Sequence, residues 1–299
     1  MANSIAYAQK FVPIIDDIYK AASYTDGMDA SVKPDFSGVN EVKVLKVSTT
    51  GLGDYSRSTG YPKGDVTAAW ETFKLTEDRG KEFSIDRMDD EETLGMAFGE
   101  VTGKFMRDWV VPELDAYRFA KYASTEGISS AAATLTKDTI IAAFDEAVRQ
   151  MDEDEVPREG RRLYVSSDLQ PALNAAITRT YASDAGVNTA LASYNNMPII
   201  YVPKTRFYTA ITMNTGVAEA SGSASWGYVK ASSAADINFM LIQPDAILQV
   251  VKFALPKVFT PDENQDKDMW KFQFRVYHDA FVYENKAKGV YLHKKEASE

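Results

Sequence analysis

The stretch from Asp89 to Ser124, DDEETLGMAFGEVTGKFMRDWVVPELDAYRFAKYAS, decides the fold. Its apolar residues recur at spacings of three and four, the period of one face of an α-helix. They are Leu94, Phe98, Val101, Phe105, Trp109 and Pro112. Acidic residues crowd its start and Arg118 and Lys121 lie near its end, as the helix dipole favours. Such a helix would span roughly 50 Å, about three times the mean globular length. The stretch therefore predicts one long spine helix.

Two features interrupt the regularity of this predicted helix. Pro112 has no backbone donor and clashes with the carbonyl four residues earlier, which predicts a kink near Asp108–Val111. Gly95, Gly99 and Gly103 fall every fourth residue and form one narrow stripe, although each glycine costs about 1 kcal/mol relative to alanine. The stripe predicts either close packing against another backbone or a helix that bends between two shapes, and the sequence leaves both open.

The composition excludes several classes of protein. The 299 residues contain no cysteine, so disulfides, thiolate zinc sites and cysteine nucleophiles are excluded. A net charge of −10 argues against a protein that grips nucleic acid with a basic face. No apolar run approaches the roughly 18 residues of a membrane span, and no cationic region introduces a signal core. We therefore expect an ordered globular protein that is neither secreted nor in a membrane.

The region before the spine helix predicts a protruding hairpin. Residues 39–47, VNEVKVLKV, are strand-like, and a phase slip at Val44–Leu45 predicts a bulge or burial on both faces. Residues 48–65 are rich in Gly, Ser, Thr and Asp, and a polar loop of this length is usually functional. Two further strands, 66–75 and 81–86, would be joined by a tight turn at Thr76–Gly80. Because isolated hairpins are marginally stable, we expect this one to rest on another subunit.

The region after the spine helix predicts a mixed α/β unit followed by long strands. Residues 127–134 form a small-residue linker, and Thr136 would cap an amphipathic helix. Ser167–Gln170 matches a capping box that would open a second helix. The predicted strands are 162–165, 198–202, 208–213, 237–242, 246–253 and 270–277, with a closing hairpin from 280–283 and 289–292.

Candidate catalytic and metal-binding motifs are all incomplete. His278 precedes Asp279 directly, but adjacent strand residues point to opposite faces, so they predict no catalytic dyad. His293 falls in a tail that we expect to be exposed. The sequence Gly51-Leu-Gly53 lacks the rest of a phosphate-binding motif, and residues 152–155 lack the alternating ligands of a calcium loop. We therefore expect no catalytic residue, no cofactor and no metal site, which favours a structural role over an enzyme.

The order of parts resembles the major capsid protein of tailed bacteriophages, which has the Hong-Kong-97-type fold. Three stretches carry the resemblance: Val111–Arg118 (VPELDAYR), Ile237–Lys252 with its internal QPDA, and Tyr277–Tyr283 with Lys286–Tyr291. The resemblance implies an α+β fold. It would comprise an N-terminal arm (1–38), an extended β-hairpin loop (39–88), the spine helix of a peripheral domain (89–126), a mixed α/β axial domain (127–255) and C-terminal strands returning to the peripheral domain (256–299).

The resemblance also implies a function and partners. The chain would self-assemble through hexamers and pentamers into an icosahedral virion shell that encloses double-stranded DNA without sequence-specific binding. Assembly would occur in the host bacterial cytoplasm, from a phage or a prophage copy, with a portal and decoration proteins as further partners. No long helical segment precedes the arm, so a separate scaffolding protein is implied. Membranes have no part in this scheme.

Particular residues follow from the same resemblance. Arg57, Tyr61 and Lys63 in the loop would contact a neighbouring subunit. The type member of the family bonds a loop lysine covalently to a neighbour's asparagine, but no matching asparagine aligns here, so that chemistry is not carried over to Lys63. Gly95, Gly99, Gly103 and Pro112 would let the spine helix change curvature when a shell expands.

Two alternatives remain open from the sequence. An encapsulin-like nanocompartment shell would share the fold but enclose enzyme cargo. An α/β hydrolase or binding protein with an unrecognised site belongs to a different class, and a deep pocket would favour it.

Overall fold

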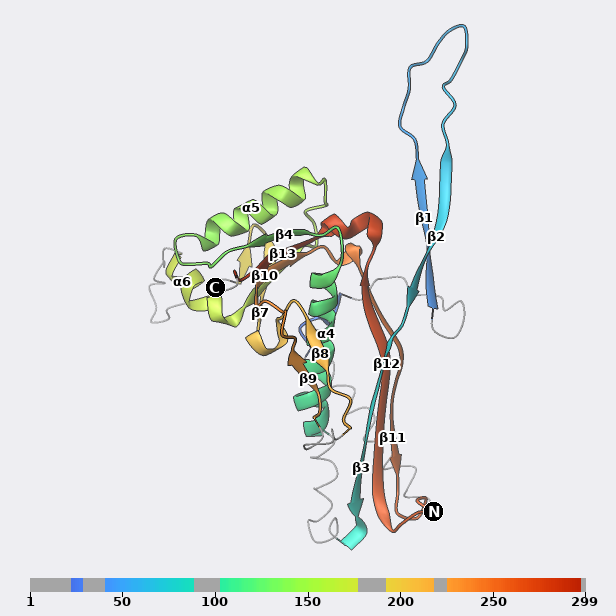
Figure 1. The fold of residues 1–299 in the computed structure, drawn as a ribbon, viewed down its shortest axis with the longest axis vertical. Helices are drawn as coiled ribbons and strands as arrows, with labels where there is room; N and C mark the ends of the chain where they lie inside the picture. The colour runs from blue at the N-terminus through green and yellow to red at the C-terminus, as the bar shows by residue number, and fades with distance from the viewer. Residues whose placement is uncertain (1–22, 29–40, 89–102, 177–191, 218–224, 297–299) are drawn as a thin grey trace.

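One helix, α4 (Val111–Ser124), lies between two β-sheets in the computed structural model of the protein (Figure 1). The structure describes residues 23–28, 41–88, 103–176, 192–217 and 225–296. Most of the predicted N-terminal arm lies outside these described residues, as does the first part of the predicted spine helix with Gly95 and Gly99.

The larger sheet has six strands in the order β4-β13-β10-β5-β7-β6. Strand β10 is an apolar run that is buried throughout, as expected for a strand covered on both faces. The sheet is mixed, because β4 pairs with β13 and β5 with β7 in parallel, whereas the other pairs are antiparallel. The strands are β4 (Ser129–Ala132), β5 (Arg162–Ser166), β6 (Ser193–Tyr194), β7 (Met197–Val202), β10 (Ile237–Ile242) and β13 (Val290–Lys294).

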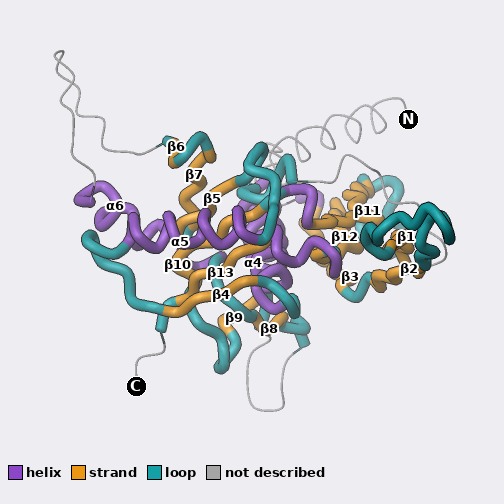
Figure 2. The backbone as a smooth tube through the Cα atoms, turned by 90° about the horizontal axis from the view of Figure 1, so that it is seen from above, coloured by secondary structure: helices purple, strands orange, loops and turns teal. Residues whose placement is uncertain are grey.

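Helices cover both faces of this sheet, which confirms the predicted mixed α/β unit. Phe239 and Leu241 of β10 pack with α5 (Ile140–Glu153), while Met240 and Ile242 pack on the opposite face with residues of α4. Figure 2 shows α5 lying across the strands, with α6 (Gln170–Ala176) beside it. Short helical turns occur at η2 (Ser167–Leu169), η3 (Lys204–Arg206), η4 (Pro244–Ala246) and η5 (Glu284–Gly289).

The second sheet consists of three long antiparallel strands, β11 (Ile247–Phe259), β12 (Met269–Val282) and β3 (Glu77–Asp86). Phe272, Phe274 and Val276 of β12 pack against Leu114 of α4, which we call the central helix, and against Met106 in the turn just before it. The alternation predicted for residues 270–277 therefore does place one face of the strand against a core. The register of β11 against β12 shifts between Val251 and Phe253.

Two smaller two-stranded ribbons complete the described chain. Strands β1 (Glu41–Thr49) and β2 (Val66–Lys74) form an antiparallel hairpin that projects from the rest of the molecule (Figure 1). Strands β8 (Ile211–Met213) and β9 (Tyr228–Lys230) form a short ribbon beside α4. The protruding hairpin predicted around residues 48–65 is thus confirmed.

The described part of the spine helix is irregular just before Pro112. Residues 103–105 are α-helical, Met106–Val110 form a π-helical turn (η1), and α4 follows. The Val111 N–H donates to the Met106 carbonyl, five residues earlier, in the segment where the proline predicts a disruption. A π turn holds more residues per turn than an α turn, so the face of the helix rotates. The predicted apolar face is therefore wrong at Trp109, whose exposure is 51%, and Val110 is buried instead.

Two predicted strand connections and one predicted bulge are wrong. Thr76–Gly80 is not a tight hairpin turn, because β2 pairs with β1 whereas β3 pairs with β12 and already begins at Glu77. Residues 280–282 belong to β12 and do not form a closing hairpin, because β13 pairs with β10 and β4. Val44–Leu45 carries no bulge, since the β1–β2 register is continuous, and Leu45 is about half exposed.

Three further local predictions are also wrong. Part of the predicted linker, Ser129–Ala132, is the edge strand β4. The Ser167–Gln170 capping box makes no side-chain cap hydrogen bond and begins with a 3-10 turn. His293 is buried in β13, where its Nδ1 lies 3.1 Å from Nδ2 of Asn238 and its ring stacks on Phe239 at 4.8 Å.

Candidate assembly surface

The hairpin arm, defined as β1, β2 and the connecting residues 50–65, is anchored to the molecule at its base. Val42 and Phe73 are buried there with Leu248 and Val250 of β11. The Phe73 ring lies 4.8 Å from that of Phe281. Apolar burial therefore fixes the base of the arm to the long strands.

Beyond this base, one face of the arm is apolar and exposed. Leu45 pairs with Trp70 and Val47 with Ala68 in the hairpin register. Because residues two apart share a face of a strand, these side chains lie in one stripe, which we call the arm face. Leu45, Val47 and Trp70 have exposures of 49%, 51% and 65%. The arm face consists of Leu45, Val47, Val66, Ala68 and Trp70.

The three predicted contact residues, Arg57, Tyr61 and Lys63, are all exposed in the connecting residues at the tip of the arm. The Tyr61 ring is 86% exposed and contacts the ring of Tyr55 edge to face, with centroids 5.0 Å apart. Ser56 organises the turn, because its hydroxyl oxygen accepts hydrogen bonds from the backbone N–H groups of Ser58 and Thr59 and lies 2.9 Å from the Ser58 hydroxyl. The structure thus brings the three residues onto one loop, and their contact with a neighbour stays a prediction.

The predicted flexible positions of the spine helix are only partly described. Gly103 begins the described helix and Pro112 lies in the first turn of α4, directly after the π-helical turn. Gly95 and Gly99 lie outside the described residues. Bending of the spine helix remains a prediction.

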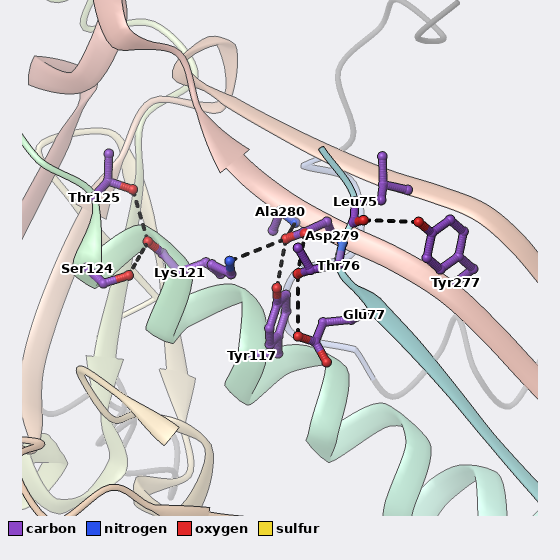
Figure 3. A network of polar contacts seen from close by, with 10 residues as sticks. All are labelled: Leu75, Thr76, Glu77, Tyr117, Lys121, Ser124, Thr125, Tyr277, Asp279 and Ala280. Atoms are coloured by element: carbon purple, nitrogen blue, oxygen red, sulfur yellow. Dashed lines mark hydrogen bonds and ion pairs between the residues drawn. The ribbon is translucent and has the colours of Figure 1, made fainter. Parts of the chain in front are cut away.

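A buried carboxylate fixes the point where the arm joins the body (Figure 3). Asp279 of β12 is 1% exposed. Its Oδ2 accepts hydrogen bonds of 3.0 Å from both the backbone N–H and the hydroxyl of Thr76, one of the two residues between β2 and β3. Its Oδ1 accepts one of 2.8 Å from the Tyr117 hydroxyl of α4, and Lys121 Nζ lies 3.8 Å away. Asp279 therefore joins the arm junction, the long strand and the central helix.

The titration of Tyr117 suits its role as a donor to Asp279. Burial raises the pKa of the Tyr117 hydroxyl above its ordinary value, and the negative charge of Asp279 raises it further. The hydroxyl therefore keeps its proton over the physiological range and can donate to the carboxylate throughout.

His278 precedes this carboxylate and is equally buried, at 1% exposure. Its ring meets Tyr117 edge to face at 5.3 Å, and neither ring nitrogen has a hydrogen-bond partner among the described residues. Burial, with the charges of Arg118 and Arg79, lowers the pKa of His278 to about 3. The complete burial of His278 and Asp279 was not predicted from the sequence, and the absence of a catalytic dyad stays a prediction.

A second buried carboxylate holds residues 23–28 against α4. Asp115 has a fully buried side chain that accepts hydrogen bonds from the Ser23 hydroxyl at 2.7 Å, the Tyr24 backbone N–H at 3.0 Å and the Thr25 hydroxyl at 2.8 Å. Arg206 Nη1 donates to the same carboxylate at 3.2 Å. This short segment is therefore an integral part of the core packing.

Sequence reasoning missed the residues that build the arm face and the two buried carboxylates. Apolar residues at 45 and 47 and at 66, 68 and 70 alternate along the two strands, which predicts one apolar face on the hairpin. The pattern does not show that this face is left exposed by the rest of the chain. No group of His, Cys, Asp and Glu side chains within the described ranges is arranged to hold a metal ion. Nor is any helix in that part of the chain long and apolar enough to cross a membrane.

Replacing the carboxylate of Asp279 should destabilise the fold strongly. Asp279→Ala leaves the Thr76 and Tyr117 donors without their acceptor, and each unsatisfied buried group costs about 1–3 kcal/mol. We expect the free energy of unfolding, measured by urea denaturation, to fall by about 3–5 kcal/mol. Asp266→Ala removes a carboxylate that is 79% exposed and should change it by about 0.5 kcal/mol or less. Equal effects of the two changes would contradict the assigned role of Asp279.

Acidification should destabilise the protein through His278. The unfolded chain binds a proton at this residue near its ordinary pKa of 6.5, whereas the folded chain does so only near pH 3. Between these values the unfolded state holds more protons, so the free energy of unfolding falls as pH falls. At about 1.36 kcal/mol per pH unit, the free energy of unfolding should fall by about 2 kcal/mol between pH 6.5 and pH 5. The His278→Phe variant should not show this part of the pH dependence of the free energy of unfolding. The same pH dependence in the wild-type protein and the variant would contradict the assignment to His278.

Comparisons with known proteins place this geometry in a recognised fold. A scan against protein-family models finds no match, and a search of curated proteins finds none either. The structure resembles the mature capsid of bacteriophage PhiM1, with a TM-score of 0.62, 12% identity and coverage of 93% of this chain and 88% of that chain. It also resembles the capsid of cyanophage P-SCSP1u, with a TM-score of 0.58, 13% identity and coverage of 90% and 88%.

A virus-like particle from Pyrococcus furiosus is a third similar structure, with a TM-score of 0.57, 10% identity and coverage of 96% of this chain and 99% of that chain. Identities this low carry information on the fold alone. Each of these three matches covers at least 90% of this chain. The chain therefore has the Hong-Kong-97-type fold of the tailed-phage capsid proteins that it resembles.

Proposed function

We propose that the protein is a structural, non-enzymatic subunit that self-assembles into an icosahedral shell enclosing double-stranded DNA. The observation that carries the proposal is the exposed arm face on a hairpin that the molecule holds only at its base. The fold supports it, because tailed-phage capsids are among the structures that the chain resembles.

The arm exposes an apolar face that no other part of the described chain covers. A two-stranded hairpin is marginally stable in water, and clustered apolar side chains on a surface usually mark a contact with another molecule. A standard protein interface buries about 800 Å² on each partner, and the arm face with the tip residues would supply much of that area. A second copy that covers the arm face would stabilise both the hairpin and the contact.

The proposal extends to the assembly and its partners. Hexamers and pentamers of this chain would form the shell of a virion, assembled in the cytoplasm of a host bacterium. A separate scaffolding protein, a portal and decoration proteins would be its partners, and DNA would be enclosed without sequence-specific contacts. The domain boundaries predicted from the sequence would divide the subunit of such a shell into an N-terminal arm, an extended β-hairpin loop, a peripheral domain and an axial domain.

A second candidate is an encapsulin-like shell that encloses protein cargo. The similarity to the Pyrococcus furiosus virus-like particle, of which 99% is covered, favours this alternative. Nucleic acid recovered from purified particles would support the phage-type shell, whereas a co-purifying enzyme without nucleic acid would support the nanocompartment.

Removing the arm face should block assembly without unfolding the subunit. We expect wild-type protein to show closed shells or capsomer rings by negative-stain microscopy, and Leu45→Asn with Trp70→Asn to reduce the assembled fraction at least about tenfold, since two large apolar anchors are lost. Ser48→Asn with Thr67→Asn, a pair on the opposite face, is the matched control and should assemble normally. A wild-type protein that is monomeric under all conditions would overturn the proposed function.

Reversing the charges at the tip should weaken assembly more than folding. Arg57→Glu with Lys63→Glu changes two exposed residues that have no role in the described core. A single exposed ion pair contributes only about 0–1 kcal/mol, but in a shell the contact would recur at every copy. We expect an unchanged melting temperature and a lower particle yield by size-exclusion chromatography. An unchanged yield would exclude these residues from the contact.

A further inference from the structure

A cavity of about 270 Å³ lies where three parts of the fold meet. Strands β3 and β12 form one wall, and the π-helical turn with the start of α4 forms another. The residues that follow β8 and precede β9 form the third. Trp109 and Trp226, each about half exposed, border the cavity on the solvent side. The cavity is therefore open to solvent beside the two tryptophan rings.

Both tryptophan rings at this opening lie against glycines. A Cβ atom at Gly216 would overlap the ring of Trp226, and one at Gly227 would lie 3.1 Å from the ring of Trp109. Both glycines have a positive φ, of 75° and 72°, which other residues rarely adopt. The absence of side chains at these two positions lets the rings pack closely on the backbone. The opening is therefore preformed, as is usual for binding pockets.

The residues that line the cavity carry one positive charge in excess. Arg79 is matched, because its Nε and Nη2 donate to the Glu113 carboxylate at 2.7 and 3.2 Å. His278 is buried in the wall and uncharged at neutral pH, since burial lowers its pKa to about 3. Lys81 is the remaining charged residue of the lining. A ligand with a single negative charge would balance it.

The carboxylates next to Lys81 in the chain lie on the other face of the sheet. Asp78 and Glu82 differ from Lys81 by an odd number of positions in β3, and alternate strand residues point to opposite faces. On that other face Arg275 Nε donates to Asp78 at 2.8 Å, and Gln273 Nε2 donates to Glu82 at 2.6 Å. Neither carboxylate is therefore available to Lys81.

Among the described residues, the ammonium group of Lys81 contacts only aromatic rings. Its Nζ lies 3.0 Å from the ring centroid of Trp226 and 5.9 Å from that of Phe83. A ring face attracts and positions a cation, but an ammonium has three N–H donors, and a carboxylate accepts them in stronger, charge-assisted hydrogen bonds. The Lys81 side chain is only partly buried, and its Nζ is not among the buried atoms without a partner. A ligand can therefore reach it.

The remaining walls favour an aromatic ring of limited size. Phe83, Phe105 and Phe274 line the cavity, with Phe105 lying 4.8 Å from Phe83 and 6.2 Å from Phe274 in edge-to-face contacts. Such contacts are a preferred geometry of aromatic groups. The volume is slightly below the roughly 300 Å³ at which pockets for small molecules begin, which suits one ring with a short side chain. We propose that this cavity binds an aromatic group that carries one carboxylate, with the carboxylate on Lys81 Nζ.

Such a group has two sources, a free aromatic acid or a second copy of this chain. At the tip of the arm, Asp54 and Tyr55 are adjacent and both exposed. The arm projects away from the strands that line the cavity (Figure 1), so this pair would have to come from a second copy. That source rests on the proposed function, whereas binding of a free acid does not.

The test uses 3-phenylpropionate, its uncharged amide and 3-phenylpropylamine, which carry the same ring with a negative, a neutral and a positive end. Isothermal titration calorimetry of the full chain at low salt should show the acid binding at least about tenfold more tightly than the amide, because hydrogen bonds between charged groups are the stronger ones. The amine should bind most weakly. Lys81→Gln should remove the preference for the acid.

Lys257→Gln is the matched control for this variant. Lys257 is an exposed lysine of the same sheet. It precedes Val258, which packs toward the central helix, so it lies on the face opposite the cavity. The variant should keep the preference for the acid. Loss of the preference in both variants would overturn the assignment to Lys81.

A spectroscopic measurement locates the ligand in the wild-type protein and covers the case in which Lys81→Gln fails to fold. The chain has four tryptophans, so ¹H–¹⁵N NMR of the indole groups can follow each one. Addition of 3-phenylpropionate should shift the signals of Trp109 and Trp226 and leave that of Trp70, on the arm face, unchanged. No binding of the acid, equal affinity for the amide, or unshifted Trp109 and Trp226 signals would overturn the proposal.

The source of the group is decided by assembly. Should a second copy supply it, then Asp54→Asn, as well as saturating 3-phenylpropionate, should lower the assembled fraction. Should the natural ligand be a free acid, assembly should be unchanged while binding persists. Absence of assembly under every condition would count against the proposed function alone and leave the free acid as the ligand, because binding of 3-phenylpropionate is measured on the unassembled chain.

Discussion

A carboxylate that is taken out of water must be surrounded by donors, and this requirement fixes the course of two segments of the chain. Asp279 of β12 accepts hydrogen bonds from Thr76, at the point where the arm joins the body, and from Tyr117 of the central helix. Asp115 draws residues 23–28 onto the same helix. Apolar packing of Met28 and Leu75 also holds these segments, and the hydrogen bonds to the buried carboxylates fix their backbone position. The central helix is the common partner in both cases, because Asp115 belongs to it and Tyr117 donates to Asp279.

The parts of this arrangement that could be predicted from the sequence are those set by local periodicity. The apolar run at 237–242 and the alternation at 270–277 correspond to β10 and β12, because burial on two faces or on one leaves a direct trace in the residue pattern. The protruding hairpin could likewise be predicted, since a long polar stretch between two strands leaves few other folds. The order of these elements also indicated the Hong-Kong-97-type fold, and the structure agrees with it.

The parts that could not be predicted depend on contacts between residues far apart in the chain. Whether residues 77–86 pair with β2 or with β12 is decided by tertiary packing, and the local pattern suits both. The same applies to His293, whose place beside charged residues at the end of the chain suggested exposure although β13 is an inner strand of the six-stranded sheet. The cavity that His278 lines could not be predicted from the sequence either, because its walls come from four separate stretches of the chain. Arg57, Tyr61 and Lys63 were correctly expected in a loop, but which molecule they contact is a property of an assembly.

The attachment of the arm at one end makes it a lever. From the buried Val42 to Thr49 at the end of β1, the strand extends by about 24 Å at roughly 3.4 Å per residue. A tilt of about 10° at the base, within the range of adjustments that strand twist allows, would displace the far end of the strand by about 4 Å. The tip lies farther out and would move more. A small change of backbone angle just beyond the buried base of the arm would therefore move the tip by several ångströms, while the two sheets and the helix between them stay unchanged.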